Sequence, residues 1–159
     1  MWPPSFWYKI YEPFILMAAG FGEASIKHDK ERYEHKYEYC DLLITGSGPS
    51  GLASAYAAAK NGARVILAED KPRFGGSLLT SDVNIGNQTG VEWTEKIIAE
   101  LKSMPNVTVK NRSQVFGYYD HNMLVMSERI SDHLPKTQKY LPKQRLWYIR
   151  ANEVLISSG

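Results

Sequence analysis

The chain has 159 residues, of which 43% are hydrophobic and 23% are charged. This composition is typical of a globular protein and excludes disordered, collagen-like and disulfide-stapled chains. The only cysteine, Cys40, cannot form an internal disulfide or a zinc cluster, and it favours a reducing compartment, the cytoplasm. A net charge of +2 does not indicate a nucleic-acid partner, and the longest apolar stretch, residues 14–21, is too short to cross a membrane.

The first 40 residues differ in composition from the rest of the chain. Residues 1–22 are rich in aromatic side chains, among them Trp2 and Trp7, and this density predicts an arm that packs on a surface. Residues 23–41 mix charges with tyrosines, without sustained helical or strand periodicity, and they predict a solvated connector. We therefore expect an arm and connector over residues 1–40 and a dinucleotide-binding domain over residues 41–159.

The domain opens with a strand, a glycine-rich turn and a helix. Residues 41–45 (DLLIT) are apolar, GSGPSG follows them, and an alanine-rich segment from about Pro49 to Lys60 predicts a helix that ends at Asn61 and Gly62. ARVILAED then predicts a second strand. Both strands are almost continuously apolar, as expected for parallel strands that are covered on both faces.

The later elements complete the predicted fold. Residues 91–104 show one apolar face and predict a helix that ends at Pro105, NVTVKN predicts a third strand, and the region from Val115 predicts a hairpin that turns at residues 120–122. RLWYIRANEVLISSG predicts another hairpin, turning at Ala151 and Asn152. We expect an α/β, Rossmann-like FAD/NAD(P)-binding fold in three layers, with a parallel sheet and an antiparallel hairpin or meander insertion. Since such a sheet needs later strands and helices, we expect it to be incomplete at Gly159.

The motif GxGxxG, formed by Gly46, Gly48 and Gly51, indicates a dinucleotide site because a predicted strand precedes it and a helix follows it. The first glycine permits the turn, the second allows a pyrophosphate to approach the backbone, and the third lets the helix pack on the strand. The helix N-terminus offers N–H groups and a partial positive charge to the phosphates.

Glu69 ends the second strand at about the 20-residue spacing at which a carboxylate reaches an adenosine ribose. It favours NAD or FAD over NADP, although Lys71 and Arg73 leave NADP open as an alternative. Gly75 and Gly76 form a second glycine pair, typical of flavoproteins with two dinucleotide sites. The predicted cofactor-binding residues are Gly46, Ser47, Gly48, Pro49, Ser50, Gly51, Glu69, Asp70, Gly75, Gly76 and Ser77.

The sequence predicts neither a metal site nor a catalytic side chain. The four histidines are scattered without HxH or HExxH spacing, and GSGPSG is not the GxSxG motif of a nucleophilic serine. We expect Cys40 to pack as a small apolar residue. The contribution of this chain to catalysis is therefore expected to be cofactor binding, because the difficult chemistry belongs to the cofactor.

Four segments resemble, in order, the middle part of the alpha subunits of heterotetrameric sarcosine oxidases. They begin with MWPPSFWYKIYEPFILMAAGFG and continue through the YEHKYEYCDLLITGSGPSG region and the hairpin VFGYYDHNMLVMSERI to RLWYIRANEVLISSG. The aromatic arm and the YYDHN hairpin are more particular than the glycine motif. ISSG stands where such folds often have an ATG-type turn, so Ser157 and Ser158 depart from the pattern while Gly159 fits it.

The resemblance implies a cytoplasmic complex of alpha, beta, gamma and delta subunits that oxidatively demethylates sarcosine to glycine and passes the one-carbon unit to tetrahydrofolate. It implies NAD in the alpha-subunit dinucleotide site, with FAD as the alternative occupant, and FMN at the interface with the beta subunit. The isolated chain is expected to be inactive. Two alternatives stay open: another FAD- or NAD-dependent amine or pyridine-nucleotide oxidoreductase of the same fold, or a non-catalytic cofactor-binding or assembly module.

Overall fold

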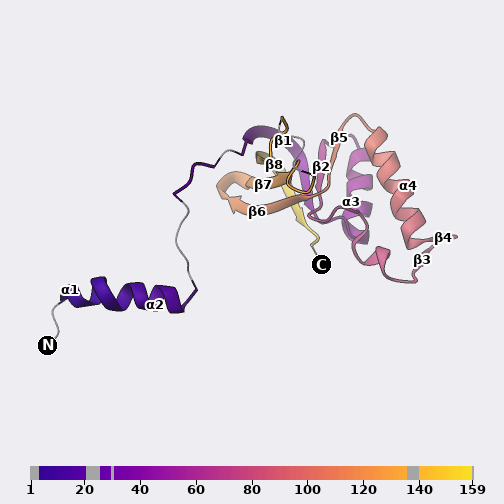
Figure 1. The fold of residues 1–159 in the computed structure, drawn as a ribbon. Coiled ribbons are helices and arrows are strands. Elements are labelled where there is room, and N and C mark those ends of the chain that lie inside the picture. The colour runs from indigo at the N-terminus through magenta and orange to yellow at the C-terminus, as the bar shows by residue number, and fades with distance from the viewer. Residues whose placement is uncertain (1–3, 21–25, 30, 136–139, 159) are drawn as a thin grey trace. The chain divides into compact units, whose positions relative to one another are not determined.

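The computed structural model describes residues 4–20, 26–29, 31–135 and 140–158. The expectations that concern Trp2 and Gly159 fall outside these residues. The chain divides into two compact units, Met1–Lys30 and Glu31–Gly159, both drawn in Figure 1. No helix in the described part of the chain is long and apolar enough to cross a membrane.

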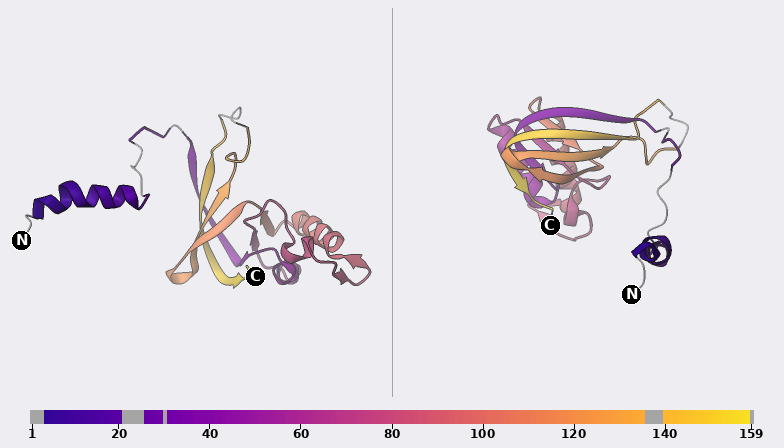
Figure 2. Two further views of the ribbon diagram at one scale, coloured as in Figure 1. Left: turned by 60° about the horizontal axis from the view of Figure 1, so that its bottom comes forward. Right: turned by 90° about the vertical axis from the view of Figure 1, so that its left-hand side faces the viewer.

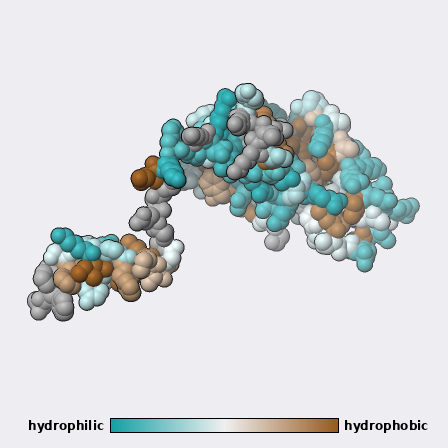
Figure 3. All heavy atoms as spheres, viewed as in Figure 1, coloured by the Kyte–Doolittle hydropathy of each residue, from teal (hydrophilic) through white to brown (hydrophobic). Residues whose placement is uncertain are grey.

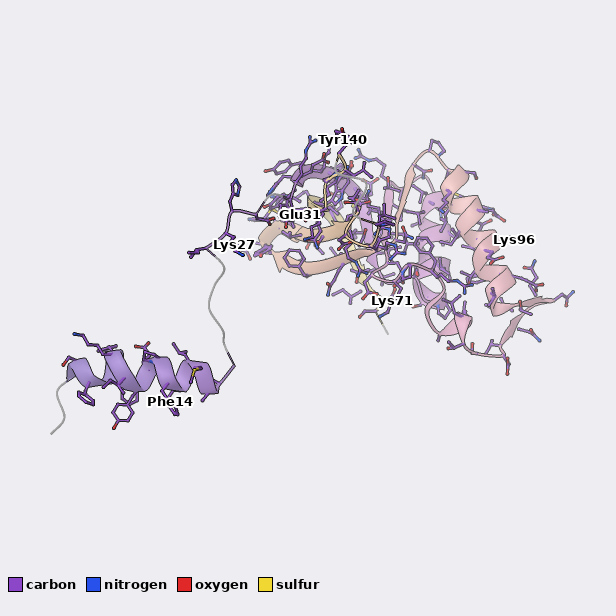
Figure 4. The ribbon with its side chains drawn as sticks, viewed as in Figure 1. Phe14, Lys27, Glu31, Lys71, Lys96 and Tyr140 are labelled. Carbon is purple, nitrogen blue, oxygen red and sulfur yellow. The ribbon has the colours of Figure 1, made fainter. Side chains whose placement is uncertain are left out.

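The first unit is helical. α1 (Pro4–Phe6), the π-helical segment η1 (Trp7–Tyr11) and α2 (Glu12–Ala18) follow one another without a break. Residues 5–20 are all exposed, and Figure 3 shows apolar side chains over this segment. The Phe14 ring projects from the helix in Figure 4 and is 63% exposed. The surface on which this aromatic arm is expected to pack therefore stays a prediction.

The second unit is built on a six-stranded sheet of order β5-β2-β1-β8-β7-β6. β1 (Tyr33–Thr45), β2 (Val65–Ala68), β5 (Val107–Lys110) and β8 (Gln144–Ile156) are parallel to one another. β7 (Met123–Arg129) pairs antiparallel with β8, and β6 (Ser113–Tyr119) pairs antiparallel with β7. This mixed sheet confirms the predicted α/β class with an antiparallel insertion.

Two hydrophobic clusters lie on opposite faces of the parallel strands. α3 (Pro49–Lys60) and α4 (Gly90–Ser103) lie beside the sheet in Figure 1, and they bury Leu52, Ile97 and Leu101 against Ile44 and Leu67. The other cluster joins Leu43 and Ile66 of the parallel strands to residues of β7 and β8, including Leu124, Met126 and Ile149. Figure 2 shows β6, β7 and β8 as a curved ribbon of strands. The helices α3 and α4, the parallel strands and the antiparallel meander of β6, β7 and β8 thus form the three expected layers.

Smaller elements connect these layers. The turn η2 (Gly76–Leu79) and the two-stranded sheet of β3 (Asn84–Ile85) and β4 (Gln88–Thr89) precede α4. η3 (Asp120–Asn122) joins β6 to β7, with His121 and Asn122 at positive φ of 57° and 50°. The predicted turn at residues 120–122 and the helix predicted from Pro49 to Lys60 are confirmed.

Two predicted elements are wrong. Residues 33–40 are not a connector but the first part of β1, which pairs with β8 from Tyr33 onwards. Most of these side chains are exposed, so backbone pairing holds the strand and no apolar alternation marks it. The hairpin predicted at Ala151 and Asn152 does not exist, because both residues lie inside the continuous strand β8.

Neighbouring strands explain why β8 does not turn at Ala151. That residue pairs with Cys40 of β1 and is 4% exposed, so it packs in the core. The Asn152 side chain donates from Nδ2 to Asp41 Oδ1 at 3.2 Å, and the main-chain carbonyl of Asn152 accepts from Asn122 Nδ2 at 2.8 Å. Contacts from both sides therefore keep two residues of turn-like composition in an extended strand.

Candidate functional site

A cleft of about 870 Å³ opens where β1, β2 and β8 end. In open α/β sheets, ligands bind outside the carboxyl ends of the strands, at the point where the strand order reverses. Of the predicted cofactor-binding residues, only Gly51 and Gly75 do not line the cleft. The lining residues are Thr45, Gly46, Ser47, Gly48, Pro49, Ser50, Ser54, Ala68, Glu69, Asp70, Lys71, Gly76, Ser77, Ser113, Gln114, Val115, Leu155, Ile156, Ser157 and Ser158.

The three glycines of the GxGxxG motif, of which Gly51 lies in the first turn of α3, differ in what surrounds them. Gly46 has a positive φ of 101°, and a Cβ atom there would overlap the carbonyl of Ser157. A Cβ atom on Gly51 would overlap the Gly46 carbonyl and lie 2.6 Å from Ser157 Oγ. At Gly48, by contrast, a Cβ atom would meet no protein atom within 4 Å. Two glycines thus permit close packing, and Gly48 keeps space open at the cleft.

The N-terminus of α3 lies at the cleft, and no side chain caps it. Gly48 is its N-cap residue, Pro49 is the first helical residue, and Pro49 and Ser50 are exposed on the cleft lining. The first N–H groups of a helix have no partner within the helix and carry a partial positive charge. The helix therefore offers hydrogen-bond donors to an anionic group such as a pyrophosphate.

The Glu69 carboxylate lies at the end of β2 and is held by the first glycine loop. It is 8% exposed, and Oε2 accepts hydrogen bonds from Ser47 N at 2.9 Å and Ser47 Oγ at 2.5 Å, while Oε1 accepts from Lys71 N at 3.0 Å. Burial alone raises the pKa of Glu69, but hydrogen bonds, led by the Ser47 hydroxyl, lower the pKa below its ordinary value. Glu69 is therefore an anionic acceptor at neutral pH.

The second glycine pair lies directly against the first loop. Gly75 has a φ of 123°, and its N–H donates to Ser47 O at 3.0 Å and to Ser47 Oγ at 3.2 Å. A Cβ atom on Gly76 would lie 3.0 Å from Gly48 Cα. Ser77, in η2, also lines the cleft. The two glycine segments, far apart in the sequence, thus form one wall of the cleft.

Lys71 and Arg73, the two cations that left NADP open as an alternative, differ in their position relative to the cleft. Lys71 lines the cleft and is labelled in Figure 4, with its Nζ 3.9 Å from Asp70 Oδ2. Arg73 is absent from the lining. The charges nearest to the end of β2 therefore include two carboxylates, Glu69 and Asp70, which would repel a 2′-phosphate, and two cations, the exposed Lys71 ammonium and the Arg129 guanidinium, which donates to Asp70 O at 2.8 Å.

Sequence reasoning missed the far wall of the cleft. Ser113, Gln114 and Val115 begin β6 and reach the cleft because β6 curls back towards the end of β2, where Ser113 N donates to Glu69 O at 2.8 Å. Ser157 N donates to Thr45 O at 2.8 Å, and Ser157 Oγ donates to Gly46 O at 3.0 Å. The resemblance places ISSG where such folds often have an ATG-type turn, and this position could have indicated that Ser157 lines the cleft.

The described residues contain neither a cluster of metal ligands nor an accessible cysteine. Among the described residues, no group of three or more His, Cys, Asp or Glu side chains is arranged to hold a metal ion. Cys40 is 1% exposed and lies in the core between the sheet and the meander. Burial, together with Asp41 and Glu38, raises the pKa of its thiol to about 12. Cys40 is therefore a packing residue with little thiolate character.

Sequence comparisons place this chain beside flavin-dependent oxidoreductases. Residues 41–114 match the family described as FAD dependent oxidoreductase. The chain is 43% identical over all its 159 residues to the sarcosine oxidase subunit alpha of Rhizobium meliloti (strain 1021). It is 34% identical over 142 residues to the corresponding subunit of Corynebacterium sp. (strain P-1). The chain spans only 16% and 15% of the lengths of these relatives.

Solved structures share the fold. L-proline dehydrogenase from P. horikoshii superposes with a TM-score of 0.60 at 18% identity, covering 86% of this chain and 25% of that protein. THI4 of Thermovibrio ammonificans gives a TM-score of 0.54 at 21% identity, covering 76% of this chain and 58% of that protein. These likenesses, with the family match, confirm the predicted Rossmann-like fold, and the antiparallel strands are those of this structure.

Proposed function

Since this chain is homologous over its whole length to the sarcosine oxidase alpha subunits and belongs with them, we propose that it binds NAD in its cleft as the dinucleotide-binding part of such an oxidase. The oxidoreductase family is established by these matches, and the choice of NAD is our proposal. FAD is the alternative occupant, and the matched family is described as FAD dependent.

The observation that carries the proposal is the ionised Glu69 beside the two glycine loops. Its carboxylate can accept hydrogen bonds from the free hydroxyls of an adenosine ribose, while the space at Gly48 and the N-terminus of α3 suit a pyrophosphate. Because a Cβ atom at Gly48 would project into open space, the loop fits a group that approaches the backbone closely. The bound nicotinamide would supply hydride transfer; this chain binds and orients it.

The proposal extends to the complex. We propose oxidative demethylation of sarcosine, a CH–NH donor, to glycine, with one-carbon transfer to tetrahydrofolate, by an assembly with beta, gamma and delta subunits. FMN would lie at an interface between subunits. A cytoplasmic location belongs to the same proposal and is supported by the single, buried Cys40. The chain alone is proposed to bind dinucleotide without oxidising sarcosine.

Calorimetric titration of the purified protein with NAD, FAD and NADP tests the binding proposal, and a sarcosine turnover assay with an electron acceptor tests the activity. We expect NAD to bind more tightly than NADP, and sarcosine to be oxidised only by the multi-subunit assembly. Tighter NADP binding would contradict the role of Glu69. An assembly that oxidises another amine and not sarcosine would favour the alternative amine oxidoreductase, and dinucleotide binding with no turnover even by the multi-subunit assembly would favour a non-catalytic module.

A further inference from the structure

Ser47 occupies a central position among the segments that form the cleft. It follows Gly46 in the first loop and is 0% exposed. Its N–H and hydroxyl both donate to Glu69 Oε2, at 2.9 and 2.5 Å. Its carbonyl and hydroxyl oxygens both accept from the Gly75 N–H, at 3.0 and 3.2 Å. One residue therefore ties together the first loop, the end of β2 and the second glycine pair.

The side chain adds something that the backbone alone does not supply. A residue at this position without a hydroxyl would keep the N–H bond to Glu69 and the carbonyl bond to Gly75, because both use the main chain. The hydroxyl adds a second, charge-assisted bond to the same carboxylate oxygen, and such bonds are shorter and stronger than neutral ones. With Lys71 N bound to Oε1, the two oxygens are fixed in one orientation.

We infer that Ser47 is a positioning residue whose hydroxyl orients the Glu69 carboxylate for a ribose hydroxyl and so contributes to the choice of NAD over NADP. This inference rests on the proposed function for its ligand. Ser47 fills the two acceptor sites of Oε2 and Lys71 N takes one of the two on Oε1, so Glu69 can still accept one hydrogen bond from a ribose hydroxyl through Oε1. Holding the carboxylate in advance reduces the ordering cost of binding.

The charged surroundings of Glu69 define what a pH experiment can report. Asp70 and Lys71 follow it on the same segment. From the neighbouring elements, the Arg129 guanidinium donates from Nη2 to Asp70 O at 2.8 Å. Ser47→Ala removes none of these three charged groups. A shift in the titration of Glu69 on that change therefore reports the missing hydrogen bond.

The test compares wild type, Ser47→Ala and the control Ser103→Ala, which removes a hydroxyl at the end of α4 that donates to Glu100 O at 2.6 Å. The proteins are used as purified, with any chains that accompany them. NAD and NADP affinities are measured by calorimetry from neutral pH down to below the ordinary Glu pKa, as far as each variant stays folded, because the pKa of Glu69 is lowered. In the ligand-free protein, carboxyl carbon NMR follows Glu69, whose signal is assigned with Glu69→Gln.

We expect Ser47→Ala to weaken NAD binding about three- to tenfold, the range of one hydrogen bond, and to reduce the preference for NAD over NADP. Removing a donor to the carboxylate favours its protonated form, so NAD binding should fail at a higher pH than in wild type. On the Glu69→Gln background, Ser47→Ala should have little further effect, because Ser47 acts through Glu69. Ser103→Ala should match wild type throughout.

Two outcomes separate this inference from the proposed function. If wild type binds NAD while Ser47→Ala shows the same pH profile and the same preference for NAD over NADP, the inference is wrong and the proposed function stands. If wild type binds no dinucleotide, the proposed function fails, and the specificity role fails with it. The NMR titration still decides the orienting bond: an unchanged Glu69 titration in Ser47→Ala overturns it.

Discussion

Gly48→Ala and Gly51→Ala add the same methyl group to one loop, and the structure predicts opposite consequences. At Gly48, φ is −65° and a Cβ atom meets nothing within 4 Å, so alanine fits the backbone and the protein. Alanine reduces the entropy of the unfolded chain by about 0.4–1 kcal/mol but is a poorer N-cap by a similar amount. The free energy of unfolding should therefore change by less than about 1 kcal/mol, and dinucleotide binding should weaken at least about tenfold, or 1.4 kcal/mol.

Gly51→Ala should instead lower the stability of the fold. Its methyl group would overlap the Gly46 carbonyl and crowd Ser157 Oγ, and overpacking of this kind costs about 1–3 kcal/mol or more. For a chain of this length, each kcal/mol lowers the melting temperature by about 2–4 °C. Thermal unfolding and calorimetry on both variants separate the effects. Wild-type NAD affinity in Gly48→Ala would refute the claim that this loop faces the pyrophosphate.

Two further substitutions and one labelling experiment test other parts of the structure. Glu69→Gln should weaken NAD binding by about 1.5–3 kcal/mol, the range of a charge-assisted hydrogen bond, and equal calorimetric affinities would remove Glu69 from the site. Because the folded-state pKa of Glu69 is lowered, its carboxylate stabilises the fold above its unfolded pKa, and this stabilisation is lost as the pH falls through the folded pKa. Urea unfolding at descending pH should therefore show a smaller decrease in the free energy of unfolding for Glu69→Gln than for wild type. Glu128 accepts from Lys110 Nζ at 3.4 Å and from Trp147 Nε1 at 2.6 Å, so Glu128→Ala should lower the free energy of unfolding by about 3–5 kcal/mol. A change below about 1 kcal/mol in urea unfolding would show that these contacts do not join β7 and β8 to β5. Cys40, with its thiol pKa raised to about 12, should react with a thiol reagent only on unfolding, and rapid labelling of the native protein would contradict its burial.

The sequence predicted the elements whose signals are local. The apolar run before GSGPSG, the alanine-rich helix and the face of residues 91–104 all carry their periodicity in neighbouring residues, and each folds as expected. The glycine motif also located the cleft, because strand, turn and helix follow one another directly. Local pattern was thus enough for the first βαβ unit and for most residues of the two glycine segments that line the cleft.

Non-local pairing decided what the sequence could not predict. Residues 33–40 and the segment through Ala151 and Asn152 are extended because β1 and β8 pair along their whole lengths, a contact between residues more than 100 positions apart. The same holds for the hydrogen bonds of Ser47 to Glu69 and Gly75, which join three separate segments. Composition alone cannot place such partners, since it describes each segment without its neighbours.

The most direct test of the central claim is identification, by mass spectrometry, of the molecule released on denaturing protein that was purified without added cofactor and then saturated with equal concentrations of NAD, FAD and NADP. We expect wild type to retain NAD and the Gly48→Ala variant to retain much less of it. Recovery of FAD or NADP in its place, or equal retention by wild type and Gly48→Ala, would contradict the assignment of NAD to this cleft.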